Sequence, residues 1–244
     1  MPQERNVQFL DLTLPTPAEN VALDEALWRA AESGGDAEYL RVWESPICFV
    51  VLGRNCPAAG DVWLDRCAAE GVQVLRRTSG GGTVLVGPGC FNFTLVLRYD
   101  RAVHLDGVGT SLDYVLERML AAVRLIEPRA DRAGASDLVV GDRKFCGNAQ
   151  RRGQTHFLHH GSILCDFDLR LVARYLREPA RQPTYRAGRE HSDFLTNVRL
   201  NRDEFGRRLR NAWACQVAAD RWPVEEVAEL VETKYERSEW TLAK

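Results

Sequence analysis

Lysine is scarce in this chain of 244 residues, since only three of its 32 basic residues are lysines. Two of them, Lys234 and Lys244, lie near the C-terminus, and only Lys144 lies in the body of the sequence. A compact ammonium on a flexible stem can do what a rigid guanidinium fork cannot. Lys144 is therefore a candidate functional residue, and chance placement of a rare residue is the alternative.

Long hydrophobic runs are also missing. The longest, 47–52 and 93–97, are far shorter than the roughly 20 residues of a membrane helix, and Met1–Arg5 does not resemble a secretion signal. We therefore expect a cytoplasmic protein that does not engage a membrane. The net charge is −2, from 32 basic and 34 acidic residues, so no overall basic excess would attract nucleic acid.

The seven cysteines show no metal-binding or disulfide pattern. Their number is odd, and neither a Cys-x-x-Cys pair nor a Cys/His finger spacing occurs. This usage favours reduced thiols and argues against a zinc site, and no metal ligands among the side chains are expected.

The apolar periodicity predicts an α+β fold. Thr16 and Glu19 form a capping box around Pro17, from which a helix is expected to continue to Gly34. Further helices are expected over 61–69, 111–126, 168–177, 202–218 and 224–235. Strands are expected over 39–43, 47–53, 72–76, 83–86, 90–97, 137–140, 144–150 and 156–166. Because these elements alternate without a steady βαβ rhythm, we expect a mostly antiparallel mixed sheet packed with helices.

Glycine-containing turns and the chain length refine this prediction. Turn 87–89 predicts a hairpin of the strands on either side of it, and turn 141–143 predicts a second hairpin. Segment 179–195 is expected to be a long surface loop or lid. The length suits one domain over 1–244, with a core of about 15–200 and a helical C-terminal annex of about 201–244.

The glycine-rich segment 76–83 is the strongest local signal. Three consecutive glycines, Gly80–Gly82, suit a loop that something approaches closely, and the amides of such a loop can form an anion-binding nest. At the edge of this loop, the guanidinium of Arg77 can donate two parallel hydrogen bonds to phosphate or carboxylate oxygens. The alternative is a wide turn with an incidental arginine. The segment is not a Walker A motif, because no Gly-Lys-Ser/Thr follows.

The segment around Lys144 is the second signal. Strand alternation places Lys144, Cys146 and Asn148 on one face and Phe145 on the other, beside Gly147, where a ligand can approach the backbone. A buried lysine needs an anionic partner, which a bound carboxylate or phosphate can supply. The alternative is an exposed polar face.

Two adjacent histidines form the third signal. His159 and His160 point to opposite faces of a strand, so they cannot both ligate one metal. A histidine hydrogen-bonded near a ligand and one satisfied in the core both remain open.

Together these blocks resemble the lipoate-protein ligase and octanoyltransferase family, which is related in fold to the biotin-protein ligases. The resemblance lies in Arg-Arg-x-Ser-Gly-Gly-Gly-x-Val, Asp-Leu, Lys-x-x-Gly-x-Ala-Gln and His-Gly-x-Ile-Leu, here residues 76–84, 137–138, 144–150 and 160–164. Weaker similarities occur at 20–25, Trp43 and 53–55. The resemblance implies a class II biotin/lipoate-ligase-like catalytic domain with an apolar tunnel for a medium-length fatty chain.

In such ligases ATP and Mg²⁺ activate lipoate or octanoate as an acyl-adenylate, which a lysine of a lipoyl carrier domain attacks. The implied carriers are 2-oxoacid dehydrogenase E2 subunits and the glycine cleavage H protein. Lys144 would be catalytic, bridging the acyl carbonyl and the α-phosphate. The implied nucleotide site is Arg77, Ser79, Gly80, Gly81, Gly82, Thr83, Val84, Leu85 and Asp137. The implied acyl site is Trp43, Arg77, Gly82, Lys144, Cys146, Gly147, Asn148, Ala149, His160 and Gly161.

A cluster of arginines is the candidate docking surface for an acidic carrier domain. A solvated helix face paired with Asp203 and Glu204 is the alternative. The cluster comprises Arg181, Arg186, Arg189, Arg207, Arg208 and Arg210.

The sequence departs from the cysteine-dependent octanoyltransferases. Their nucleophile lies about 15 residues before or about 35 after the counterpart of Lys144, where this chain has Arg129 and the neighbourhood of Glu178. A shifted nucleophile, Cys146 or Cys165, keeps an acyl-carrier-protein-dependent octanoyltransferase as the alternative. A subunit that only binds lipoyl-adenylate or a carrier domain is the second alternative. The chain is also too short for the accessory domain of long ligases, which a separate protein could supply.

Overall fold

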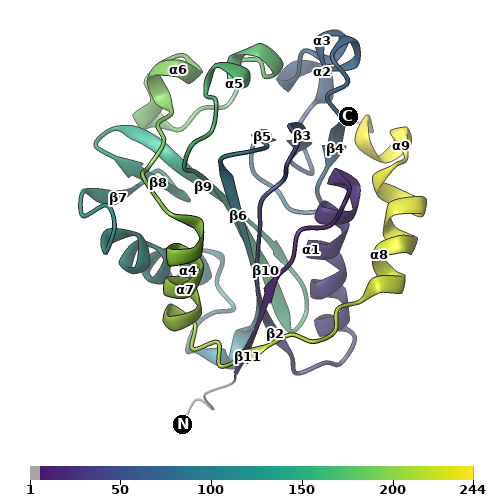
Figure 1. Cartoon of the computed structure of the whole chain (residues 1–244), viewed down its shortest axis with the longest axis vertical. Coiled ribbons are helices and arrows are strands. Elements are labelled where there is room, and N and C mark those ends of the chain that lie inside the picture. Colours follow the sequence, from purple (N-terminus) through teal and green to yellow (C-terminus); the bar gives the residue numbers. More distant parts are fainter. Residues whose placement is uncertain (1–5, 244) are drawn as a thin grey trace.

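A computed structural model describes residues 6–243 and has the expected α+β architecture, with a large and a small β-sheet between helices (Figure 1). The eight-stranded sheet has the order β11-β1-β2-β6-β10-β9-β8-β7, and the three-stranded sheet has the order β4-β3-β5. Most neighbouring strands are antiparallel, as predicted; the exceptions are β1 with β2 and β11, and β3 with β4.

The strands of the described chain are β1 (Val7–Asp11), β2 (Glu38–Trp43), β3 (Phe49–Leu52), β4 (Val74–Arg76), β5 (Val84–Val86), β6 (Cys90–Arg98), β7 (Ala130–Ala133), β8 (Asp137–Val140), β9 (Arg143–Arg152), β10 (His156–Leu164) and β11 (Val217–Ala218). The helices are α1 (Pro17–Glu32), α2 (Ala58–Asp61), α3 (Leu64–Ala69), α4 (Val108–Arg124), α5 (Arg170–Tyr175), α6 (His191–Phe194), α7 (Arg202–Ala212), α8 (Val224–Leu230) and α9 (Ser238–Thr241). Shorter helical turns are η1 (Tyr99–Arg101), η2 (Thr184–Arg186) and the π-turn η3 (Val231–Tyr235). Within residues 6–243, no helix combines the length and the apolar character that crossing a bilayer requires.

Helices cover both faces of the large sheet (Figure 1). Helices α4 and α7 pack in one hydrophobic cluster with side chains such as Phe93, Phe145 and Trp213. Helix α1 and the C-terminal α8 pack in a second cluster on the other face. The central strand β6 is buried along almost its whole length, which explains its nearly continuous apolar sequence.

The start of α1 follows the predicted capping box. The Thr16 hydroxyl accepts the Glu19 amide at 3.2 Å, and the Glu19 carboxylate accepts the Thr16 amide at 2.8 Å. Pro17 occupies the first turn, where its missing N–H costs nothing. The helix ends at Glu32, two residues before Gly34.

The first predicted hairpin is wrong and the second is confirmed. Strands β5 and β6 follow one another across turn 87–89 but belong to different sheets, since β5 pairs with β3 while β6 pairs with β2 and β10. A glycine-proline turn reverses the chain but does not choose the partner of a strand, and here burial on both faces draws β6 into the large sheet. Strands β8 and β9 form the second hairpin as predicted.

The C-terminal part also differs from the prediction. The helix expected over 202–218 ends at Ala212, because the chain then takes a positive φ of 49° at Ala214 and adds β11 to the edge of the large sheet. The segment 179–195 is not a plain loop, since it contains η2 and α6. Strands β1 and β7 were not predicted from the sequence.

A buried ion pair attaches the C-terminal segment to α1. The Lys234 ammonium donates to both carboxylate oxygens of Glu25, at 2.6 and 2.9 Å, and the Tyr235 hydroxyl donates to the same carboxylate at 2.5 Å. Burial opposes ionisation of Glu25, but these donors outweigh it and lower the pKa of the carboxyl. Nearby, Arg76 donates to the Thr241 carbonyl at 2.8 Å, so α9 is held at the start of the glycine-rich segment.

We predict that Lys234→Met lowers the free energy of unfolding by about 1–3 kcal/mol, because it removes one of the two cations that pair with the buried Glu25 carboxylate and leaves only Arg29. Combining it with Glu25→Gln should restore most of the loss. Chemical denaturation measures both variants, and an unchanged midpoint for Lys234→Met would contradict this role. Since folding lowers the pKa of Glu25, its contribution is present above the ordinary carboxyl pKa and disappears as pH falls through the folded value.

Candidate functional site

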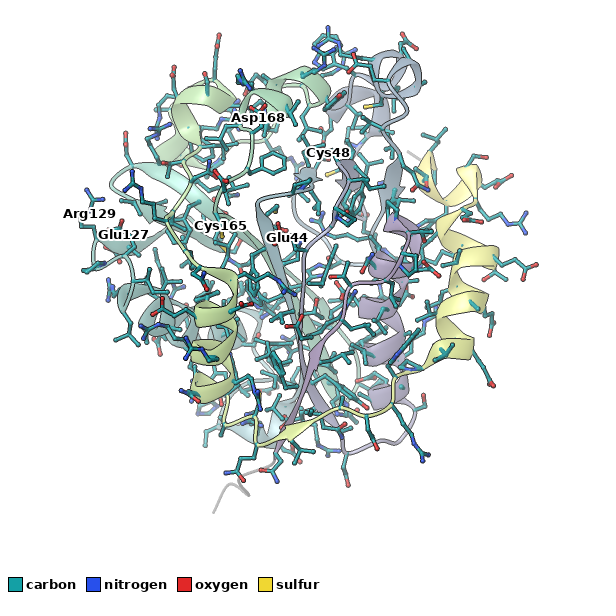
Figure 2. The ribbon with its side chains drawn as sticks, viewed as in Figure 1. Glu44, Cys48, Glu127, Arg129, Cys165 and Asp168 are labelled. Carbon is teal, nitrogen blue, oxygen red and sulfur yellow. The ribbon has the colours of Figure 1, made fainter. Side chains whose placement is uncertain are left out.

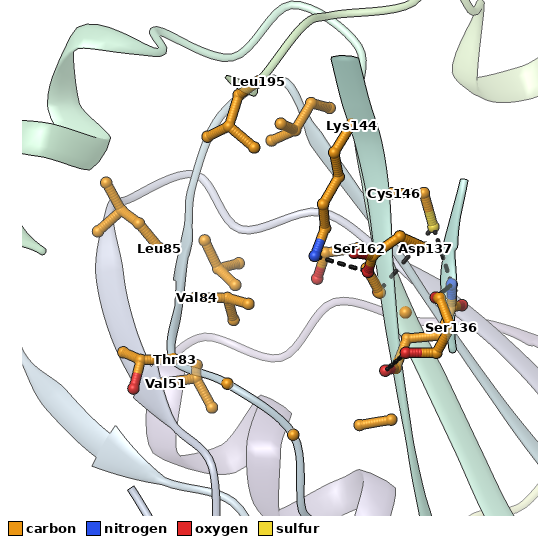
Figure 3. A pocket seen from close by; sticks show the side chains of 18 of the residues that line it. Val51, Thr83, Val84, Leu85, Ser136, Asp137, Lys144, Cys146, Ser162 and Leu195 are labelled. Carbon is orange, nitrogen blue, oxygen red and sulfur yellow. Dashed lines mark hydrogen bonds and ion pairs between the residues drawn. The ribbon is translucent and has the colours of Figure 1, made fainter. Parts of the chain in front are cut away.

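A cavity of about 380 Å³ lies between residues of both sheets, α1 and the segment 172–195 (Figure 3). A pocket of this volume suits a small-molecule ligand, and most of its exposed lining is apolar. It is lined by Trp43, Arg77, Gly81, Gly82, Thr83, Val84, Leu85, Asp137, Lys144, Cys146, Gly147, Asn148, Ala149, His160 and Gly161 among others. These were all singled out in the sequence; Ser79 and Gly80, also singled out, do not line the cavity.

The glycine-rich loop between β4 and β5 is shaped by a close backbone approach. Gly81 has a φ of +81°, and its carbonyl oxygen lies only 2.0 Å from where a Cβ on Gly53 would be. Only glycine fits at position 53 unless the loop moves. The Arg54 amide then donates to the Ser79 carbonyl at 2.9 Å, which attaches the loop to the chain that follows β3.

The sequence predicted that Arg77 extends from the edge of this loop. In the structure its side chain lies inside the loop and supports it. Its side chain is buried, and it donates to the Ser79 hydroxyl at 2.9 Å and to the Gly80 and Gly82 carbonyls at 2.5 and 2.8 Å. Burial lowers the pKa of the guanidinium to about 10, and no carboxylate within residues 6–243 pairs with it. A positive charge without a countercharge therefore lies at the cavity wall.

Lys144 points into the cavity, where it meets an acid (Figure 3). Its ammonium lies 2.7 Å from Asp137 Oδ1, and the Tyr185 hydroxyl donates to the other oxygen, Oδ2, at 2.7 Å. Burial, together with the Asp137 charge, raises the pKa of Tyr185. Gly147 leaves room for this arrangement, since a Cβ there would lie 2.8 Å from Lys144 Nζ.

A β-bulge, not simple alternation, determines which side chains face the cavity. Between Leu138 and Val139 the register shifts from Leu138–Cys146 to Val139–Lys144, so Phe145 is an extra residue. Phe145 and Cys146 consequently both pack in the core cluster under α4 and only border the cavity, whereas the Lys144 side chain extends into it.

The prediction that Lys144, Cys146 and Asn148 share a face is therefore wrong. The Asn148 amide contacts Cys146 Sγ at 3.5 Å on the side away from Lys144. Burial raises the pKa of the Cys146 thiol well above its ordinary value. Figure 3 shows Cys146 and Lys144 on opposite sides of β9.

The two histidines do face opposite sides of β10. His159 is buried in the core, where it contacts the side chains of Gln150 and Asn148 at 3.0 and 3.2 Å, and burial lowers its pKa to about 3. His160 faces the cavity, between the Ser79 hydroxyl at 2.6 Å and Asp24 at 3.2 Å. Residues 6–243 contain no cluster of three or more histidine, cysteine or carboxylate side chains that could hold a metal ion.

The other positions relevant to a nucleophile lie outside the cavity. Cys165 is not part of the lining, and burial raises the pKa of its thiol to about 12. Arg129 pairs with Glu127 at 2.9 Å on the exterior, and Figure 2 shows both residues at the edge of the molecule, apart from Cys165.

Sequence reasoning missed two aspartates of the lining, Asp24 and Asp61, and also Tyr185, which lies outside the lining and donates to Asp137. Tyr185 comes from the expected loop, and Asp24 lies within α1 in a block noted only as a weaker similarity. Asp61 accepts the Thr83 hydroxyl at 2.6 Å. An aspartate inside a predicted helix is ordinarily solvated, so nothing but the apolar residues around Asp24 could have indicated its burial.

The same fold occurs in lipoate-protein ligases of known structure. One is the bipartite lipoate protein ligase of Thermoplasma acidophilum, solved in a study that also describes its E2 lipoyl domain; it is 22% identical, with 97% of this chain and 96% of that chain covered and a TM-score of 0.82. Another is a lipoate-protein ligase A bound with ATP, 23% identical, with 98% and 99% covered and a TM-score of 0.78. The P. falciparum LipL1 in complex with lipoate is 18% identical, with 98% and 74% covered and a TM-score of 0.73.

Residues 16–213 match the family model of the lipoyl protein ligase A/B catalytic domain. The chain belongs to this family, as the resemblance of its motifs predicted.

We predict that Gly53→Ala destabilises the protein by about 1–3 kcal/mol and displaces the glycine-rich loop, because its Cβ would overlap the Gly81 carbonyl. Gly80→Ala is the matched control, since no atom lies within 4 Å of where its Cβ would be and its φ is not positive. It should change stability by no more than about 0.5 kcal/mol. Thermal unfolding compares the two, and equal effects would rule out the close approach as the reason for Gly53.

Proposed function

We propose that this protein is an ATP-dependent ligase that attaches lipoate or octanoate to a lysine of lipoyl carrier domains. The observation that carries the proposal is that Lys144 and the glycine-rich loop with its buried Arg77 face one largely apolar cavity. The apolar walls suit a medium-length acyl chain. The two cations, Lys144 and Arg77, suit the oxygens of the acyl carboxylate and of the phosphate to which it becomes joined.

The proposed reaction has two steps. The fatty acid carboxylate attacks the α-phosphorus of ATP, which forms an acyl-adenylate and releases pyrophosphate. The carrier lysine amine then attacks the acyl carbon, which forms the amide and releases AMP and a proton. Negative charge develops on oxygens near the junction of acyl group and phosphate in both steps, where a mobile ammonium such as that of Lys144 stabilises it.

Mg²⁺ is proposed to enter with the ATP phosphates, its usual mode of binding to nucleotide sites. Two carboxylates of the cavity lining, Asp61 and Asp137, could supply oxygen ligands to the Mg²⁺ ion. The ion pair with Asp137 holds the Lys144 ammonium at the cavity wall.

The octanoyltransferase alternative has weaker support. A thiolate nucleophile needs exposure and a lowered pKa. Cys146 borders the cavity but is buried, Cys165 lies outside the cavity lining, and burial raises the pKa of both thiols. The chemistry of the cavity thus favours adenylate formation over a thioester intermediate.

The carrier domain and the cellular setting complete the proposal. Much of the expected arginine surface is already paired, Arg186 with Glu178, Arg189 with Asp142 and Arg208 with Glu204, so less free charge remains for an acidic carrier domain. The bipartite T. acidophilum ligase supports the idea that a separate accessory protein assists. We propose a single catalytic domain acting in the cytoplasm.

We predict that pyrophosphate release requires both ATP and lipoate or octanoate, and that Lys144→Arg reduces it at least about 100-fold with an unchanged fold, since a guanidinium cannot follow the developing charge. Arg129→Lys, which changes an exposed cation, is the control and should keep full activity. A coupled pyrophosphate assay measures both. No release by the unchanged protein at saturating substrates would refute the ligase.

We also predict that Cys146→Ser and Cys165→Ser each keep carrier modification within about threefold of the unchanged protein, because neither thiol reaches the substrate cavity in a reactive form. Mass spectrometry after incubation with octanoyl-acyl carrier protein should detect no thioester adduct. An adduct that disappears in one of the serine variants would establish the octanoyltransferase instead.

A further inference from the structure

A continuous chain of polar side chains connects α1 to the glycine-rich loop. Arg41 Nη1 donates to Asp24 Oδ1 at 2.7 Å, and Asp24 Oδ2 lies 3.2 Å from His160 Nδ1. His160 Nε2 lies 2.6 Å from the Ser79 hydroxyl, which in turn accepts Arg77 Nε at 2.9 Å. Every link is within hydrogen-bonding distance, and Arg41, Asp24 and Ser79 are all buried.

The groups that can only donate or only accept limit the directions of these hydrogen bonds. A guanidinium can only donate, and the Asp24 carboxylate can only accept. His160 must therefore carry a proton on Nδ1 toward Asp24. In the neutral imidazole, Nε2 is then an acceptor, and the Ser79 hydroxyl donates its proton to it. The Ser79 oxygen then has its lone pairs free for Arg77, so all of these donors have acceptors.

The chain ends on the glycine-rich loop. Arg77 Nη2 donates to the Gly80 and Gly82 carbonyls, and the Ser79 carbonyl accepts the Arg54 amide. The arrangement of serine, histidine and aspartate is that of a hydrolase triad. However, Ser79 does not line the cavity, so its hydroxyl is not placed to attack a substrate.

We propose that Asp24, His160 and Ser79 are positioning residues, which hold Arg77 and the glycine-rich loop in the conformation that receives the nucleotide. The loop geometry follows from the structure alone, and the nucleotide as its ligand rests on the proposed function. Asp24 acts through the tautomer of His160, in the way that a buried carboxylate orients a catalytic histidine.

Asp24→Asn tests this with little change of shape. Its Oδ1 can still accept Arg41, but its Nδ2 would donate toward His160 Nδ1 and force the other tautomer. Nε2–H would then donate to the Ser79 oxygen, which Arg77 already contacts, and the Ser79 hydroxyl proton would lose its acceptor. In a Ser79→Ala background this conflict cannot arise, so the two substitutions form a double-mutant cycle.

The first measurement is amide exchange of Arg54 in the ligand-free protein, because this amide reports the position of Ser79. We expect Asp24→Asn and Ser79→Ala each to accelerate it about tenfold, or about 1.4 kcal/mol, with no further increase in the double variant. Multiplicative effects, or no effect of Asp24→Asn, would overturn the proposal. If Asp24→Asn does not fold, His160→Phe replaces it, since it keeps a ring and removes both nitrogens. Asp131→Asn, an exposed carboxylate, is the control and should change nothing.

The second measurement is calorimetric ATP binding, for which the same cycle should show about tenfold weaker affinity in each single variant and no more in the double. Weaker binding with multiplicative effects would overturn the link to the nucleotide. If the unchanged protein binds no ATP, the proposed function fails, while the exchange cycle still decides whether these residues position the loop.

Discussion

The extra residue in β9 is the constraint on which the cavity depends. Without the register shift at Phe145, strict alternation would place Lys144, Cys146 and Asn148 on the same face of β9. Either Lys144 would then point into the core, or Cys146 and Asn148 would point into the cavity. The bulge lets Phe145 and Cys146 fill the core under α4 while the Lys144 ammonium enters the cavity beside Asp137. One unpaired residue thus reconciles a fully packed sheet with a charged group on its other side.

Helix α1 carries two neighbouring buried carboxylates, Asp24 and Glu25, which point to different parts of the structure. Asp24 faces the sheet, where it meets Arg41 and His160, and its neighbour Glu25 faces the C-terminal segment, where it meets Lys234. Burial opposes ionisation of both carboxyls, but their partners outweigh it and lower both pKa values. The helix therefore connects the cavity wall and the C-terminal segment through side chains that are expensive to leave unpaired.

The glycine-rich loop illustrates how close packing and charge act together. Gly53 allows the backbone of Gly81 to approach closely. Inside the loop, Arg77 donates hydrogen bonds to the Gly80 and Gly82 carbonyls. The guanidinium has no acidic partner in the described chain, so its charge remains available at the cavity wall. An anion in the cavity would find both a shaped loop and an uncompensated cation.

The sequence by itself determined what depends on local order: the capped α1, the β8–β9 hairpin, the α+β class and, through its motifs, the family and many of the residues around the cavity. It could not determine the partners of β5 and β6, the direction of Arg77, or the side of β9 on which Cys146 lies. Burial on both faces, a register shift and contacts between segments far apart in the chain decide these features. Such contacts form only when the whole structure packs, because turn signals and strand alternation carry no information about which distant segment will be the neighbour.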